Sequence, residues 1–234
     1  MKAPKAELRA DRVLATLEKL HARIKARFPN AGLVDVCSDL IATARYSARE
    51  AADLTRPHLL WRLAALLLVG LGFAAQIWAF RFLRIQVATL TAPELVQGLE
   101  AAVNLLILFG GAIWFLLTLE ERMKRQRALD ALHRLRSLAH VIDMHQLTKD
   151  PTIVLDHHKT AASPERTMTQ FELTRYLDYC AEMLALIGKL AALYAEGVRD
   201  SVVIAAVNDV EDLTSGLGRK IWQKITIIGA LEER

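Results

Sequence analysis

The sequence is short of the residues and motifs that mark several common protein classes. It has only two cysteines in 234 residues, Cys37 and Cys180, which excludes a disulfide-stabilised scaffold. Apolar residues are not scarce: they make up 53% of the chain, so there is ample material for a core and intrinsic disorder is excluded. The first thirty residues are charged and lack an apolar segment, so no cleavable signal peptide is expected.

Motifs of the familiar enzyme classes are also missing. The chain has no Walker loop, nucleophile elbow, kinase signature or CxxC pair. We therefore predict that the protein is not an enzyme and carries no cofactor, with one divalent-metal alternative considered below.

Charged residues are absent from two long apolar runs, residues 63–80 and 101–119. The only polar side chains inside them are Gln76, Asn104 and Thr118. As helices the runs would be roughly 27–28 Å long, close to the ~30 Å hydrocarbon core of a bilayer. Neither run has a polar face at helical spacing, which disfavours a soluble amphipathic helix. We predict two membrane spans, at about 60–82 and 98–119, within a transmembrane hairpin at 59–119.

Basic residues predict the orientation of this hairpin. Nine Lys and Arg residues flank the two apolar runs on the terminal sides, and only Arg81 and Arg84 lie between the runs. The positive-inside rule therefore places both termini in the cytoplasm. The net charge of +4 combines a basic part, with 20 basic and 12 acidic residues in 1–136, and an acidic part, with 10 and 14 in 137–234. Because the basic part flanks the spans, anionic lipid is the expected partner and nucleic acid is not.

The remaining segments read as helices, so the predicted fold class is all-α. Residues 1–58 form a helical pair, interrupted at Pro29–Gly32. Residues 120–150 form a stalk with no Gly or Pro as far as Leu147, and residues 151–234 form a C-terminal helical domain. The apolar stripe of the stalk is narrow, which suits contact with a second copy or with 1–58. A homo-oligomer is therefore expected.

A polar stripe follows one face of the second span. It repeats every three or four residues and comprises Glu100, Asn104, Leu108 and Gly111. In an oligomer this stripe could line a cation-selecting pore, with Glu100 as a ring of charge and Leu108 as a constriction. The alternative is that Glu100 marks the outer end of the span and Asn104 bonds a neighbouring helix.

Metal-binding residue types gather in the region from 140 to 158: His140, Asp143, His145, Asp156, His157 and His158. On a helix His140 and Asp143 share a face and His145 points elsewhere. A metal site at His140, Asp143 and His157 would therefore need the following loop to fold back. Packed or solvent-exposed histidines are the alternative.

A third set of candidates is basic and lies near Trp222. Lys189, Arg219, Lys220 and Lys224 could form a cytoplasmic anion site. The alternative is that they are ordinary surface charges on an acidic domain.

The arrangement over roughly residues 33–147 resembles the SLATT-type two-transmembrane proteins of bacterial conflict systems, which combine cytoplasmic helices, a short hairpin and a helical extension. The stretch His140–Pro151 is similar to uncharacterised bacterial membrane proteins. The resemblance implies a bacterial inner-membrane location, oligomerisation and a membrane-perturbing role, and it assigns no functional residue.

The sequence thus favours an oligomeric inner-membrane protein, a pore or channel gated by its cytoplasmic helices. The alternative is a membrane-anchored module that tethers a cytoplasmic protein partner. A metal-dependent membrane-bound enzyme at His140–His158 is a third hypothesis.

Overall fold

The structure is a computed structural model, and it describes residues 8–54, 59–83, 91–147, 149, 168–197 and 200–232. Within these residues every regular element is a helix, which confirms the predicted all-α class. The six helices are α1 (Ala10–Arg27), α2 (Leu33–Leu54), α3 (Leu59–Leu83), α4 (Ala92–Leu147), α5 (Gln170–Gly197) and α6 (Ser201–Glu232).

Two helices begin at a Thr-x-x-Glu segment, which has the sequence pattern of a capping box. The backbone N–H of Thr91 donates to the Glu94 carboxylate at 2.8 Å, at the start of α4. At the start of α5 the backbone N–H of Thr169 donates to Glu172 at 2.8 Å, and the Glu172 N–H donates back to the Thr169 hydroxyl at 3.2 Å. These bonds satisfy N–H groups that have no partner within a helix.

The two longest helices, α4 and α6, are each continuous over their full length. α4 carries both the predicted second span and the predicted stalk without interruption, as the absence of Gly and Pro from 120 to 147 indicates. α6 runs through Gly216 and Gly218, although glycine and the β-branched residues that follow are poor helix formers. Leu217, Ile221 and Ile228 are buried at helical spacing, so tertiary packing outweighs the weak local propensity.

The described residues divide into two compact units. One comprises those of 1–55 together with 125–234, and we call it the bundle. The other comprises those of 56–124, which are α3 and the first part of α4, and we call it the apolar pair.

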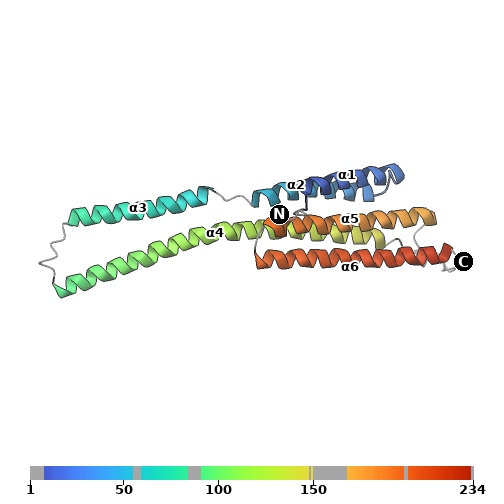
Figure 1. Cartoon of the computed structure of the whole chain (residues 1–234). Coiled ribbons are helices and arrows are strands. Elements are labelled where there is room, and N and C mark those ends of the chain that lie inside the picture. The colour runs from blue at the N-terminus through green and yellow to red at the C-terminus, as the bar shows by residue number, and fades with distance from the viewer. Residues whose placement is uncertain are drawn as a thin grey trace, which may run out of the picture. The chain divides into compact units, whose positions relative to one another are not determined.

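The bundle has one continuous apolar core. In it α5 packs against α6 and α2, and α1 packs against α2 and α5 (Figure 1). From α4 the core receives Ala128, Ala131, Leu132, Leu135, Ala139 and Ile142. The stripe of the predicted stalk, which the sequence assigned to a second copy or to 1–58, is therefore buried within a single copy. This core also encloses Cys37 and Cys180, and burial raises the pKa of the Cys37 thiol to about 11.

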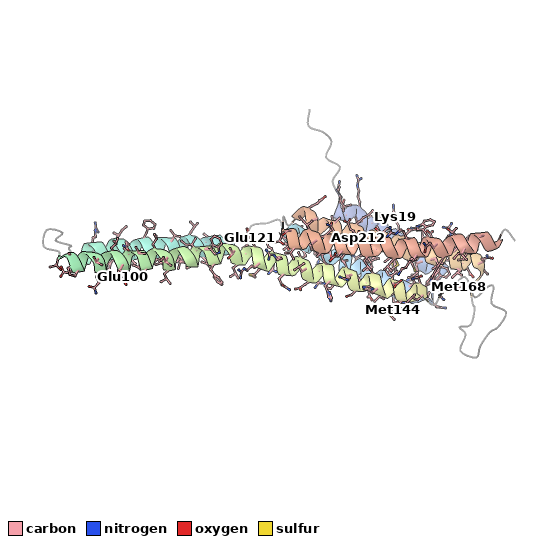
Figure 2. All side chains as sticks on the ribbon, turned by 90° about the horizontal axis from the view of Figure 1, so that it is seen from below. Lys19, Glu100, Glu121, Met144, Met168 and Asp212 are labelled. Carbon is pink, nitrogen blue, oxygen red and sulfur yellow. The ribbon has the colours of Figure 1, made fainter. Side chains whose placement is uncertain are left out.

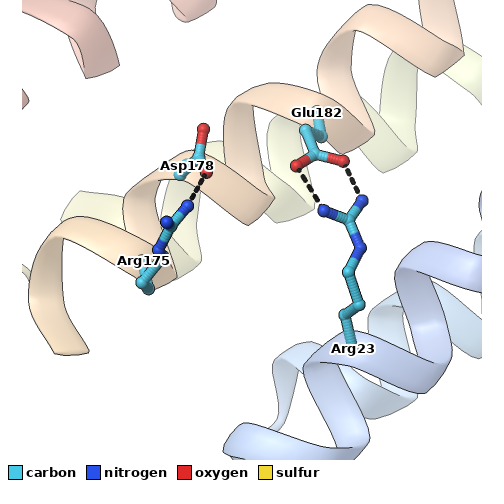
Figure 3. A network of polar contacts seen from close by, with 4 residues as sticks. All are labelled: Arg23, Arg175, Asp178 and Glu182. Carbon is cyan, nitrogen blue, oxygen red and sulfur yellow. Dashed lines mark hydrogen bonds and ion pairs between the residues drawn. The ribbon is translucent and has the colours of Figure 1, made fainter.

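A bidentate ion pair adds a polar contact between α1 and α5. Both terminal guanidinium nitrogens of Arg23 donate to the Glu182 carboxylate, and on α5 Arg175 donates to Asp178 at 3.1 Å (Figure 3). Beside this contact the ring of Phe28 meets Tyr176 edge-on at a centroid distance of 5.6 Å. The loop between α1 and α2 is thus held against α5.

The apolar pair has the opposite surface. Leu106 is 76% exposed and Trp114 is 71% exposed, and on α3 Phe73 and Trp78 are exposed as well. Among the described residues α4 is the one helix long and apolar enough to cross a membrane, and none of its apolar window is buried. The apolar stretch described in α3, Leu66–Trp78, is shorter than a span. The helix predicted at about 60–82 is present, and its crossing of a membrane stays a prediction.

Candidate functional site

The predicted pore stripe lies on the surface of α4. Glu100, Asn104, Leu108 and Gly111 are all exposed in a single copy, and Glu100 is visible on the first part of the helix (Figure 2). Within the described residues neither Glu100 nor Asn104 makes a side-chain hydrogen bond. Glu100 lines a shallow cavity with Ala92, Pro93, Val96 and Gln97, all from α4 itself. The stripe is therefore available to water, lipid or another copy.

A different face of α4 meets α3. The two helices enclose an apolar groove of about 510 Å³, lined from α4 by Ala102, Leu105, Leu106, Phe109, Gly110 and Ile113. Gly72 of α3 lies against the Phe109 ring, where an added Cβ would come within 3.0 Å of Cε1. This close approach explains why a small residue stands at position 72. None of the four residues of the predicted pore stripe lines this groove.

The predicted metal ligands are not brought together within the described part of the chain. His140 is exposed, and Asp143 accepts a hydrogen bond of 2.6 Å from the Gln146 side chain. No group of three His, Cys, Asp or Glu side chains suited to a metal occurs among the described residues. His157, the third predicted ligand, lies outside them, as do Asp156 and His158. The metal site stays a prediction.

The predicted anion site has one member with a defined structural role. Lys224 of α6 donates to the Gln146 backbone carbonyl at 3.1 Å and to the Gln146 side-chain oxygen at 2.7 Å. It therefore links α6 to the end of α4, whereas Lys189, Arg219 and Lys220 are exposed.

A polar pocket of about 470 Å³ lies in the bundle, at the C-terminal end of α4. It is lined by Phe28, Pro29, Asn30, Ala31, Gly32, His145, Lys149, Met168, Glu172 and Tyr176. The residues thus come from the turn between α1 and α2, from the end of α4 and from the start of α5. We call it the turn pocket.

The local sequence explains how the turn reaches the end of α4. Pro29 and the residues after it end α1, and the N–H of Ala31 donates to the Phe28 carbonyl at 3.1 Å to close a turn. Gly32 then lies directly against the His145 ring: an added Cβ would come within 3.0 Å of Cε1. Absence of a side chain at position 32 therefore allows His145 to occupy its place.

The protonation states of Glu172 and Tyr176 in the turn pocket follow from their surroundings. Hydrogen bonding from the Thr169 backbone N–H lowers the pKa of Glu172, so its carboxylate stays ionised near neutral pH. Burial raises the pKa of Tyr176, so its phenol keeps its proton. The Tyr176 hydroxyl oxygen lies 3.5 Å from His145 Nδ1, and the Lys149 ammonium lies 5.4 Å from the centre of the Tyr176 ring.

Sequence reasoning did not find the turn pocket. Asn30 and Gly32 entered the sequence analysis only as part of a helix break, because the pocket joins three separate segments of the chain. The available signal was His145, which does not share a helix face with His140 and Asp143.

No protein-family model, no curated protein and no solved structure matches the chain.

Proposed function

We propose that the protein is an oligomeric inner-membrane protein of bacteria, with two spans and a cytoplasmic helical bundle, whose α4 helices surround an ion-conducting path. The observation that carries the membrane assignment is that none of the apolar window of α4 is buried. An apolar surface of this length in water would be an aggregation hazard, whereas in lipid it is the favoured surface.

The bundle supports the proposal that α3 crosses the membrane together with α4. Residues from before α3 and residues from the second part of α4 onward share one core. A chain that crosses once would leave these segments on opposite sides of the membrane, so a shared core favours an even number of crossings. The 25 residues of α3, roughly 37 Å at 1.5 Å per residue, are long enough for the second crossing.

The basic residues next to the spans support a cytoplasmic bundle. Arg122, Lys124 and Arg125 follow the apolar part of α4, and Arg45 and Arg49 precede α3. Positive charge is retained on the cytoplasmic side and is attracted to anionic lipid there.

The polar stripe of α4 supports assembly around a path. An Asn104 amide facing hydrocarbon would leave its donors and acceptors unsatisfied, which is costly in lipid. The groove with α3 does not receive it, since the residues of α4 that line the groove are other ones. A neighbouring copy or a water-filled lumen would satisfy both Asn104 and Glu100.

Ion flux tests the conduction. The full chain in liposomes is expected to pass cations, and Glu100→Gln and Asn104→Leu are expected to change the flux or its selectivity. Glu121→Gln is the matched control, because Glu121 is an exposed carboxylate further along the same helix (Figure 2). Absence of flux from the wild type, or equal flux from all four proteins, would contradict the pore.

Particle mass tests the assembly. A mass in detergent and in lipid well above one copy of 26.1 kDa is expected. A single copy in both media would contradict the oligomer and with it the pore.

A membrane-anchored scaffold is the second candidate, and one observation favours it. The stripe of α4 that suggested contacts between copies is buried within one copy, so the bundle is complete by itself. It presents Trp222 of α6 with 58% of its surface exposed. A partner recovered in stoichiometric amount with the wild type and lost with Trp222→Ala would support this function; equal recovery with both would contradict a role for that surface. Deleting the C-terminal segment is unsuitable, because α5 and α6 supply much of the core.

A further inference from the structure

The turn pocket brings together groups that neither proposed function uses. A lysine, a histidine, a tyrosine and an asparagine line about 470 Å³ in the bundle, and three separate segments supply them. None of these residues belongs to the α4 stripe or to the exposed part of α6. The pocket therefore calls for its own explanation.

The cationic group of the pocket is Lys149. Its ammonium lies over the face of the Tyr176 ring, an attraction that holds a cation in place without neutralising its charge. Among the residues that the structure describes, no carboxylate lies within ion-pair distance of Lys149. The pocket thus contains a positive charge positioned by an aromatic ring.

Other side chains that carry hydrogen-bond donors line the same pocket. The Tyr176 phenol keeps its proton because of burial, and the Asn30 side chain carries an amide NH₂. His145 is fixed between the Tyr176 hydroxyl and Gly32. Donors that line the same pocket as an ammonium suit the oxygens of an anion.

Glu172 limits how much negative charge the pocket accepts. Its carboxylate is ionised, and one of its oxygens accepts hydrogen bonds from the Thr169 N–H and the Thr169 hydroxyl. One fixed negative charge in the same pocket as one ammonium disfavours a polyanion and is compatible with a ligand bearing a single anionic group. Phe28 and Met168 add apolar surface for the rest of an organic molecule.

We propose that the turn pocket binds a small organic molecule through one oxyanion group, a carboxylate or a phosphate ester, which Lys149 and the neighbouring donors hold. The site lies at the end of α4, the same helix that contains the candidate span. Its existence does not depend on whether the protein conducts ions or tethers a partner.

Equilibrium dialysis of the detergent-solubilised full chain with labelled inorganic phosphate and labelled acetate tests this site. At constant ionic strength set with chloride, saturable binding of at least one of the two probes, at one site per chain, is expected. Lys149→Gln should weaken it about tenfold or more, as expected for loss of a hydrogen bond to a charged group. Lys149→Arg should retain most of it.

Two further variants separate the site from general effects. Lys19→Gln removes an exposed lysine of α1 outside the pocket and should bind as the wild type does (Figure 2). Gly32→Ala should weaken binding by displacing His145, while the helical circular dichroism stays unchanged. No saturable binding of either probe to the wild type, or equal binding by Lys149→Gln and Lys19→Gln, would overturn the proposal.

Discussion

Two leucines of the same helix have opposite environments. Leu135 in the bundle part of α4 is fully buried, whereas Leu106 in the apolar pair is 76% exposed. The residue type and the secondary structure are identical, so the difference lies in what surrounds each one. In the bundle, other helices of the chain cover the apolar stripe. In the apolar pair, lipid is the medium that suits the exposed side chains.

This contrast separates two sources of stability. Burial in the bundle removes apolar surface from water, the main driving force for folding. In lipid, where we propose that the apolar pair lies, that force between helices is missing, so close packing and satisfied polar groups matter more. Gly72 against Phe109 is an example of such close packing in the apolar pair.

The largest expected effect is the loss of stability caused by a cavity in the bundle. Leu135→Ala should lower the free energy of unfolding of the bundle by about 2–5 kcal/mol, because the side chain is fully buried. Leu106→Ala, the same substitution at the exposed position, should change it by less than about 0.5 kcal/mol. Urea unfolding followed by circular dichroism measures both. Equal effects would show that the two parts of α4 do not differ as described.

The second largest effect is expected when a charged residue is introduced into the apolar pair. Leu106→Arg should make insertion of the span less favourable by about 3 kcal/mol, roughly a hundredfold in the ratio of inserted to uninserted chains. Glycosylation mapping of the loop between α3 and α4 reports this ratio.

Met144→Arg is the matched control, since Met144 is 68% exposed on the bundle part of the same helix. It should insert as the wild type does. Full insertion of Leu106→Arg would argue that the exposed side chain at position 106 does not contact lipid.

A smaller effect is expected at the start of α6. Asp200 accepts hydrogen bonds from the N–H groups of Val202 and Val203 and from Arg125 of α4 at 2.7 Å. Asp200→Ala should destabilise the bundle by about 1–2 kcal/mol through loss of the cap. Asp200→Asn keeps a capping oxygen and should cost less. If the two variants were equally destabilised, the ion pair would outweigh the cap.

The pH dependence of the same group has a definite sign. Burial opposes ionisation of Asp200, but the hydrogen bonds from Val203, Arg125 and Val202 outweigh it and lower the pKa below 3.8. The stabilisation is therefore fully present above the unfolded-state pKa and is lost as the pH falls through the lower folded-state pKa. Below pH 4 the wild type should lose more stability than Asp200→Asn; parallel stability curves would contradict this.

The smallest effect is expected at an exposed ion pair. Arg45 donates to Glu18 at 2.8 Å, but both side chains are more than half exposed. Arg45→Ala should change the unfolding free energy by no more than about 0.5 kcal/mol. A loss as large as that of Asp200→Ala would place this pair among the interactions that hold α1 to α2.

Much of the helical architecture could be predicted from residue patterns. Periodic apolar residues and capping signals at Thr91 and Thr169 located the helices, because these signals are local. The continuity of α6 through Gly216 and Gly218 could not be predicted from local signals, since it depends on the residues that bury Leu217 and Ile221. The helices that pack against the apolar stripe of α4 could not be predicted either. An apolar stripe indicates that it is covered by other residues, but it does not identify them.

The candidate sites divide in the same way. The stripe through Glu100 and Asn104 was visible from helical spacing alone, and the structure adds that it avoids the groove with α3. The turn pocket was not visible, because its residues come from separate segments of the chain. Gly32 lies more than a hundred residues before His145 and Tyr176. Close approach of a backbone without a side chain to a histidine ring leaves no trace in a linear pattern.

The sequence by itself determined that the chain is helical and that α4 contains a stretch suited to lipid, since composition and spacing decide both. Only the tertiary structure decided that the two ends of the chain share one core, and that this core covers the second part of α4. The physical reason is that an apolar surface determines only that water must be excluded. Which atoms exclude it depends on packing between segments far apart in the sequence.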